Sequence, residues 1–157
     1  MPNLYLALKL IHILGSAVLF GTGLGIAFFM YMAHRTGDPA AIAHTARTVV
    51  IADAVFTATA VVLQPLTGWG LMAMTGFSMF HFWIRATLVL YVFVGLCWLP
   101  VVWIQLRMRD MALAAVREGA TALPAQYWRY LRIWVALGIP AFIALVIVFW
   151  LMVAKPS

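Results

Sequence analysis

The residues with the clearest chemical potential are two histidines in the first hydrophobic stretch of the chain, His12 and His34. A neutral imidazole can ligate a haem iron, and an ionisable side chain inside a membrane segment marks a candidate functional site. A helix rises about 1.5 Å per residue, so the two histidines are roughly 33 Å apart along the axis. They share a helix face, but they cannot share a ligand.

Basic residues accompany the first histidine, His12. Lys9 precedes it and Ser16 follows it by one helical turn each, while Arg85 is expected at a similar depth in the third hydrophobic segment. Sites in helix bundles are built from side chains on facing helices, and Arg and Lys pair with anionic propionates. The pattern predicts a haem b site with His12 as axial ligand of the iron, Ser16 beside it, and Lys9 and Arg85 at the propionates. In the structural alternative, Lys9 snorkels, Arg85 anchors its helix and His12 bonds a backbone carbonyl.

A second, looser group lies in the other half of the expected bundle and consists of His34, His44 and Asp53. A carboxylate inside an apolar segment is costly unless it is paired. Its expected partner is one of three nearby side chains: Arg47, Arg35 or His34. A structural pair at the membrane edge is the favoured interpretation, and a second haem or a proton path is the alternative. His34 and His81 are the weaker candidates for the haem iron.

Two further groups of polar or soft side chains occur in the sequence. Thioethers and an imidazole suit Cu(I), and four such residues cluster near the second connection: Met72, Met74, Met79 and His81. They favour a copper-handling or transport protein as the alternative function. Gln64 and the threonines at 57, 59 and 67 are expected to form hydrogen bonds between helices rather than a transport path.

The composition defines the kind of scaffold that carries these residues. Of 157 residues, 66% are hydrophobic and 9% are charged, against roughly 25% charged in a soluble domain. Four hydrophobic segments, near residues 4–32, 48–74, 82–106 and 128–153, each exceed the about 20 residues that span a bilayer. The expected fold is all-α, a single-domain four-helix transmembrane bundle over residues 1–157. The lone Cys97 excludes an intrachain disulfide, and no cleavable signal peptide is recognised at the N-terminus.

Small residues, glycines and prolines predict how these helices pack and end. Three small residues four apart, Ala17, Gly21 and Gly25, give the first helix a smooth stripe that favours close packing as a central helix. Pro65 is expected to kink the second helix, and the Gly- and Thr-rich stretch 67–80 to form a short connection. The polar stretch 107–118 is predicted to extend the third helix beyond the membrane as far as Gly119.

The basic residues are distributed unequally between the two sides of the expected bundle. Seven arginines lie around the first and third connections: Arg35, Arg47, Arg107, Arg109, Arg117, Arg129 and Arg132. The opposite side holds only Lys9, Arg85 and Lys155. The positive-inside rule therefore predicts that both termini face outward, as in a multi-pass protein of the bacterial inner membrane. The net charge of +6 follows from this topology, and no nucleic-acid partner is expected.

The motif Lys9-Leu10-Ile11-His12, with His34 at the far end of the helix, resembles the first helix of HemJ-type protoporphyrinogen oxidases. The stretches Thr67-Gly68 and 83–90 (WIRATLVL) continue the resemblance, with Arg85 at the position of a functional lysine of that family. Arginine cannot act as a ligand or readily give up its proton, although it suits a propionate. The first helix is also similar to the membrane domain of CopD-type copper-resistance proteins. Over nearly its full length the chain resembles an uncharacterised family of bacterial four-span membrane proteins. Three stretches carry this resemblance: ARTVVIADAVF, LQPLTG and CWLPVVWIQLRMRD.

These observations predict a haem b-binding membrane redox protein. The HemJ resemblance implies porphyrinogen oxidation, and quinone-linked electron transfer is the other reaction considered. The expected partners are the lipid bilayer and a porphyrin or quinone, and self-association into a homo-oligomer is left open. A copper-handling protein and an accessory subunit without a cofactor are the alternatives.

Overall fold

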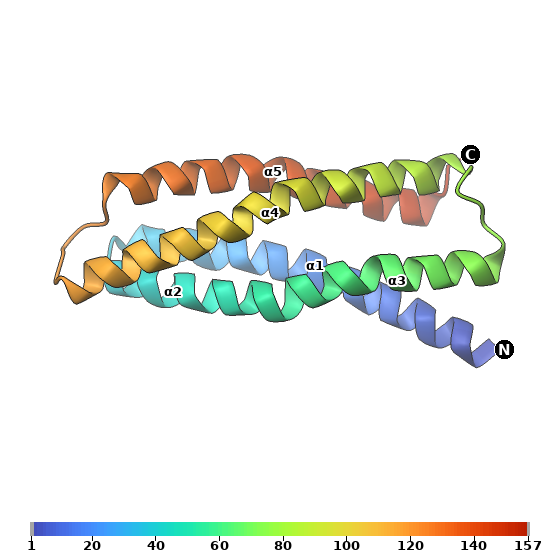
Figure 1. The fold of residues 1–157 in the computed structure, drawn as a ribbon, viewed down its shortest axis with the longest axis horizontal. Helices are drawn as coiled ribbons and strands as arrows, with labels where there is room; N and C mark the ends of the chain where they lie inside the picture. Colours follow the sequence, from blue (N-terminus) through green and yellow to red (C-terminus); the bar gives the residue numbers. More distant parts are fainter. Residues whose placement is uncertain (1, 157) are drawn as a thin grey trace.

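The computed structural model describes residues 2–156, and within them the chain is helical and contains no strand. The elements are α1 (Pro2–Thr36), α2 (Pro39–Ala52), the π-helical turn η1 (Asp53–Thr57), α3 (Ala58–Thr75), α4 (Phe82–Arg117) and α5 (Ala125–Ala154). Because α2, η1 and α3 are continuous, the described part forms four long rods, each long and apolar enough to cross a membrane. Figure 1 shows the rods lying side by side with both chain ends at the same end of the bundle. The predicted all-α fold with four membrane-length helices is confirmed.

Helix ends follow local sequence signals. The carboxylate of Asp38 caps α2 by accepting hydrogen bonds from the backbone N–H groups of Ala40 at 2.9 Å and Ala41 at 3.3 Å, as expected of an N-cap aspartate. Beyond α4, Gly119 has φ +67°, a left-handed conformation that glycine adopts without steric cost. α4 continues through the polar stretch to Arg117, close to the predicted stop at Gly119.

The second rod departs from regular α-helix at a π-helical turn and also contains Pro65 within its helix. The helix continues through Pro65, and the interruption of regular α-helix falls at the π-helical turn Asp53–Thr57. Proline lacks the N–H that would bond the carbonyl four residues earlier, here that of Val61. The hydroxyl of Tyr91 on α4 donates to this freed carbonyl oxygen. Pro65 thus creates an acceptor that ties the second rod to α4.

The predicted connection at residues 67–80 is wrong, because α3 continues to Thr75 and only residues 76–81 connect it to α4. The reason is packing. A Cβ at Gly70 would lie 3.1 Å from Leu8 Cδ1, and a Cβ at Gly68 would lie 3.4 Å from His12 Cε1. These glycines let α3 approach α1, so the contact between helices outweighs their weak helix propensity of about 1 kcal/mol each.

The first helix packs differently from the expectation of a central helix with a smooth stripe. Within the described residues, no atom of another helix lies within 4 Å of an ideal Cβ at Gly21 or Gly25, and Ala17 is exposed. The close approach occurs instead at Gly15, where a Cβ would lie only 2.5 Å from Gln64 Nε2. Ala17, Gly21 and Gly25 therefore do not form the contact with another helix, and α1 meets α3 at Gly15 instead.

The densest core lies at the end of the bundle that holds the first and third connections. Its largest fully buried side chains come from three helices: Ile42 on α2, Met108 on α4 and Tyr127 on α5. At the opposite end the buried cluster is small and centres on Trp83, Ile84 and Leu151. Most apolar side chains along the rods are exposed, as expected of helices that face lipid.

Candidate functional site

The first candidate site surrounds His12, whose ring lies between α1 and α3. Nδ1 is 2.8 Å from Thr67 Oγ1, and that hydroxyl is 2.7 Å from the carbonyl oxygen of Leu63. A threonine hydroxyl has a single proton. If it donates that proton to Leu63, the His12 ring must donate from Nδ1. The network therefore leaves Nε2 as the imidazole's lone-pair nitrogen, and no hydrogen bond to this atom occurs within residues 2–156.

Polar neighbours hold the backbone of α1 at this point. The Gln64 amide donates to the carbonyl oxygen of His12 at 2.9 Å. The Ser16 hydroxyl is 2.8 Å from the same carbonyl and 3.1 Å from Gln64 Oε1. Gln64 and Thr67 are buried, so the interhelical role expected of these two residues is confirmed. The sequence did not single out Gly15, which makes room for the Gln64 amide.

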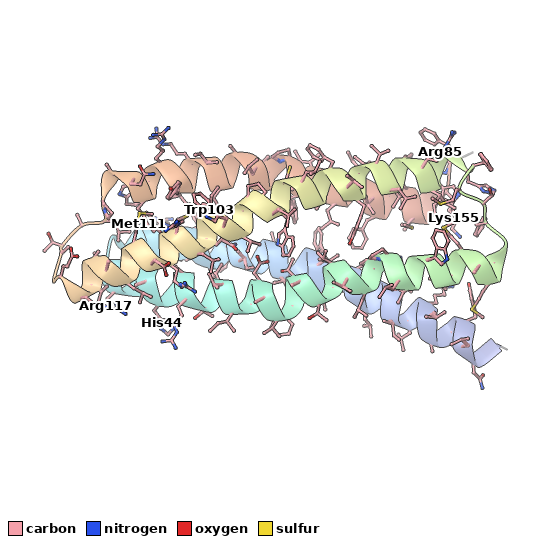
Figure 2. All side chains as sticks on the ribbon, viewed as in Figure 1. His44, Arg85, Trp103, Met111, Arg117 and Lys155 are labelled. Carbon is pink, nitrogen blue, oxygen red and sulfur yellow. The ribbon has the colours of Figure 1, made fainter. Side chains whose placement is uncertain are left out.

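The two basic residues assigned to propionates do not converge on His12. Lys9 is exposed, with its ammonium 5.8 Å from the centroid of the Tyr5 ring. Arg85 is exposed on α4 and projects to the upper edge of the molecule in Figure 2, whereas α1 lies along the lower edge at that end. The structure therefore does not bring Arg85 to His12, because α3 rather than α4 packs against α1 at this point.

The other histidines have local structural roles. His34 Nδ1 is 2.5 Å from the carbonyl oxygen of Met30, and Nε2 is 2.8 Å from the hydroxyl of the fully buried Tyr127. Both ring nitrogens are thus occupied, Nδ1 within α1 and Nε2 in linking α1 to α5. His81 Nδ1 accepts from the Ser78 N–H at 3.1 Å within its own turn, and His44 is exposed. No group of three or more His, Cys, Asp or Glu side chains suited to a metal ion occurs in the described chain.

Asp53 forms the centre of a second candidate site. It is 6% exposed, and the indole Nε1 of Trp98 donates to both of its oxygens, at 3.3 and 3.2 Å. The Gln105 amide lies between an acceptor, Asp53, and a donor, Trp134, and this sets its orientation. Its nitrogen donates to Asp53 Oδ2 at 3.0 Å, and its oxygen accepts from Trp134 Nε1 at 3.3 Å. Two tryptophans and a glutamine on α4 and α5 therefore surround the carboxyl group.

The expected ion pair of Asp53 is wrong. None of the proposed partners, Arg35, Arg47 and His34, forms a salt bridge or hydrogen bond with it in the part of the chain described. Both arginines are exposed. Neutral N–H donors from α4 replace the cation.

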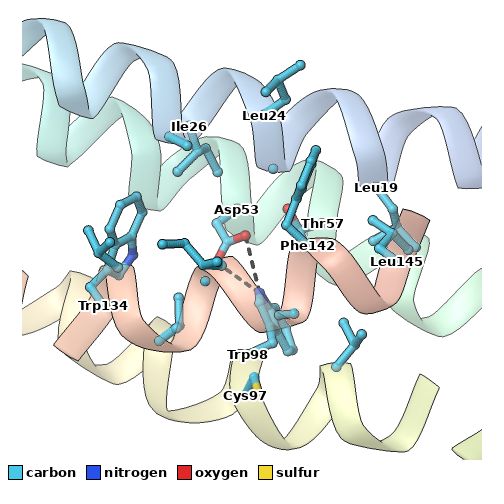
Figure 3. Close-up of a pocket in the computed structure, with 18 of the residues that line it drawn as sticks. Leu19, Leu24, Ile26, Asp53, Thr57, Cys97, Trp98, Trp134, Phe142 and Leu145 are labelled. Carbon is cyan, nitrogen blue, oxygen red and sulfur yellow. Dashed lines mark hydrogen bonds between the residues drawn. The ribbon is translucent and has the colours of Figure 1, made fainter. Parts of the chain in front are cut away.

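A cavity of about 550 Å³ lies beside Asp53 and is lined by residues of α1, η1, α3, α4 and α5. Figure 3 shows Asp53 and Trp98 at its wall, joined by their hydrogen bonds, with Thr57 and Phe142 nearby. Apart from this polar group the wall is almost entirely apolar. Sequence reasoning identified Asp53 as unusual in an apolar segment but did not predict the cavity.

Four membrane-length helices with lipid-facing apolar surfaces and a polar group in their interior define a multi-pass integral membrane protein. The sequence profile of a family described as predicted integral membrane protein (DUF2269) matches residues 6–156, and the chain belongs to this family. Neither the curated proteins nor the solved structures include a match.

Proposed function

We propose that this protein is a haem b-binding membrane redox protein in which His12 is an axial ligand of the iron. The observation that carries the proposal is the hydrogen bond between His12 Nδ1 and Thr67 Oγ1. Histidines that ligate metals commonly donate their other ring N–H to a fixed acceptor, which sets the tautomer and the ring orientation. With Nδ1 directed to Thr67, Nε2 is the nitrogen that can ligate iron.

The residues around His12 fit part of this assignment. The ring is only half-buried and lies against Gly68, while Ser16 and Gln64 hold its backbone carbonyl. Of the two basic residues assigned to the propionates, Lys9 lies one turn from His12 on α1, whereas Arg85 projects away from α1. Haem would supply one-electron chemistry at its iron, and the chain's own contribution is to position and orient one imidazole. The resemblance of residues 9–12 to HemJ-type oxidases favours a porphyrinogen as the electron donor, and a quinone is the other membrane-soluble partner.

The test is the absorption spectrum of the protein purified in detergent from cells that make haem. We expect a Soret band and, after reduction with dithionite, sharp α and β bands. A colourless preparation that also fails to acquire these bands when haem b is added would contradict the proposal. Stoichiometric copper in a colourless preparation would favour the copper-handling alternative, with its group of Met72, Met74, Met79 and His81.

We further propose that both termini face the outer side of the bacterial inner membrane. At the end of the bundle away from the termini, the α1–α2 and α4–α5 connections and their flanking helix ends carry seven of the ten basic residues. Segments rich in Lys and Arg remain in the cytoplasm. An alkaline phosphatase fused after residue 157 should be active, and a green fluorescent protein fused there should be dark after Sec export. The reverse pattern would place the termini in the cytoplasm and invert the assignment.

A further inference from the structure

The cavity beside Asp53 has the size and lining of a binding site rather than of a packing defect. Its volume of about 550 Å³ falls within the roughly 300–1,000 Å³ of small-molecule pockets. Three of its lining residues are glycines on different helices: Gly23 on α1, Gly95 on α4 and Gly138 on α5. An ideal Cβ at any of them meets no heavy atom within 4 Å among the described residues. These glycines therefore do not bring helices together; they leave space open.

Asp53 and Thr57 place two polar groups next to one another in the wall of this cavity. The carboxyl of Asp53 accepts the Trp98 indole N–H, shared between its two oxygens, and a Gln105 amide N–H on Oδ2. A carboxylate can accept about four hydrogen bonds, so acceptor positions remain free. The hydroxyl of Thr57, in the same π-helical turn, is 8% exposed and has no hydrogen-bond partner in the described structure. A buried hydroxyl without a partner costs about 1–3 kcal/mol. Turns of π-helix are frequent at functional sites.

The rest of the wall is apolar and includes aromatic rings. Tyr91, Trp98, Trp134 and Phe142 line the cavity, and aromatic walls favour a flat ring by offset stacking or edge contacts. The rim is formed by α1 and α5, where Leu24, Tyr31, Ile139 and Ile143 all line the cavity and are 51–60% exposed. In a bilayer these rim residues face lipid, so a molecule dissolved in the membrane reaches the cavity between α1 and α5.

We propose that the cavity binds a lipid-dissolved hydroxylated aromatic molecule, of the alkylphenol or quinol class, with its hydroxyl on Asp53 and Thr57. The ligand's hydroxyl donates to the Asp53 carboxyl and accepts from Thr57, its ring lies among the aromatic side chains, and its alkyl chain extends toward the rim. A phospholipid acyl chain would fill the apolar part but would leave both polar groups without a partner. The proposal concerns binding alone and is independent of haem at His12.

The test compares two probes that differ by one hydroxyl group, 4-nonylphenol and nonylbenzene, added to the full-length protein in nanodiscs. The readout is the indole N–H resonance of Trp98 in ¹⁵N-tryptophan-labelled protein, assigned from its disappearance in Trp98→Phe. We expect nonylphenol to shift this resonance saturably, with little change at Trp69, which is exposed on α3 outside the cavity lining. Nonylbenzene should bind roughly tenfold more weakly, since a hydrogen bond to a charged group contributes about 1.5–3 kcal/mol. Equal binding of the two probes, as for an adventitious apolar molecule, would overturn the proposal.

Two variants locate the binding. Asp53→Asn should weaken nonylphenol binding roughly tenfold and leave nonylbenzene binding unchanged. Gly138→Leu fills the cavity without touching a polar group, so it should remove binding of both probes. Gly21→Leu is the matched control, because Gly21 also has open space at its Cβ but does not line the cavity, and it should bind nonylphenol as the wild type does. Unaltered binding in Gly138→Leu would place the probe outside the cavity and refute the proposal even if Asp53→Asn failed to fold.

Discussion

Replacing His12 by alanine is expected to abolish the haem spectrum of the purified protein or shift it markedly. The substitution removes the imidazole whose Nε2 is the proposed iron ligand and whose Nδ1 bonds Thr67. A matched variant, Thr67→Val, keeps the ligand but removes its fixed acceptor, and loss of such outer hydrogen bonds typically costs about 10–100-fold in metal affinity. We therefore expect Thr67→Val to retain a haem spectrum but to release haem faster to apomyoglobin. Soret absorbance per protein and the rate of haem transfer are the two measurements.

The control for this prediction is His34→Ala, which should leave most of the haem absorbance. His34 is occupied at both nitrogens by Met30 and Tyr127, so its loss weakens the contact between α1 and α5 without removing a proposed ligand. Bleaching by His34→Ala alone would move the site to the half of the bundle that contains Asp53. If each variant removed about half the absorbance, the chain would carry two haems, one in each half. A coloured protein insensitive to both changes would shift the ligand to His81 or His44.

Replacing Asp53 by alanine is expected to cause the largest loss of stability of any single polar substitution in the chain. The carboxyl accepts hydrogen bonds from Trp98 and Gln105, and its removal leaves two interior N–H donors without an acceptor. Each unsatisfied donor costs about 1–3 kcal/mol in a protein interior, while interhelical hydrogen bonds in membranes average about 0.6 kcal/mol. We expect a loss of about 1–3 kcal/mol, measured as a lower melting temperature in detergent or a lower midpoint of unfolding in sodium dodecyl sulfate.

Two variants show whether the buried hydrogen bonds are the cause. Asp53→Asn keeps one acceptor oxygen for Trp98 and should lose less than half as much stability as Asp53→Ala. Asp110→Ala is the comparison variant. Like Asp53, Asp110 accepts a hydrogen bond from another side chain, in this case from Arg109 at 2.7 Å. This pair is partly exposed, and exposed ion pairs contribute about 0–1 kcal/mol, so we expect little change. Stability losses that are equal at positions 53 and 110 would argue against a special role for the interior network.

The positions of helices along the chain could be predicted from the sequence. Hydrophobic length gave the four spans, since water cannot satisfy the backbone inside a bilayer and each span must form its own hydrogen bonds. Local chemistry located several ends, as at Asp38, which caps α2, and at Gly119, which follows α4. The glycines of residues 67–76 led to the wrong prediction of a connection there, because Gly68 and Gly70 lie in the contact with α1 rather than in a turn. Glycine signals a turn in water but often a close helix contact in a membrane.

The His12 site was predictable only in part. Residue types identified His12 as a ligand candidate and Gln64 and Thr67 as interhelical donors or acceptors. The register between α1 and α3 decides that these residues meet, and it depends on where glycines let the backbones approach, at Gly15 and Gly68. That register cannot be read from the sequence of either helix alone.

The rotation of each helix about its own axis was decided by tertiary packing. In a soluble helix the apolar stripe shows which face is buried. Lipid is as apolar as the interior of the bundle, so hydrophobicity does not distinguish the lipid-facing side of a spanning helix from its packed side. For this reason the sequence could place Arg85 at the depth of His12 but could not show that it faces away from α1. It could likewise show that Asp53 needs a partner, while only the packed bundle brings Trp98 and Gln105 to it in place of a cation. Depth in the membrane is encoded in hydropathy along the chain, whereas neighbours around the axis depend on side-chain shape and hydrogen bonding between helices.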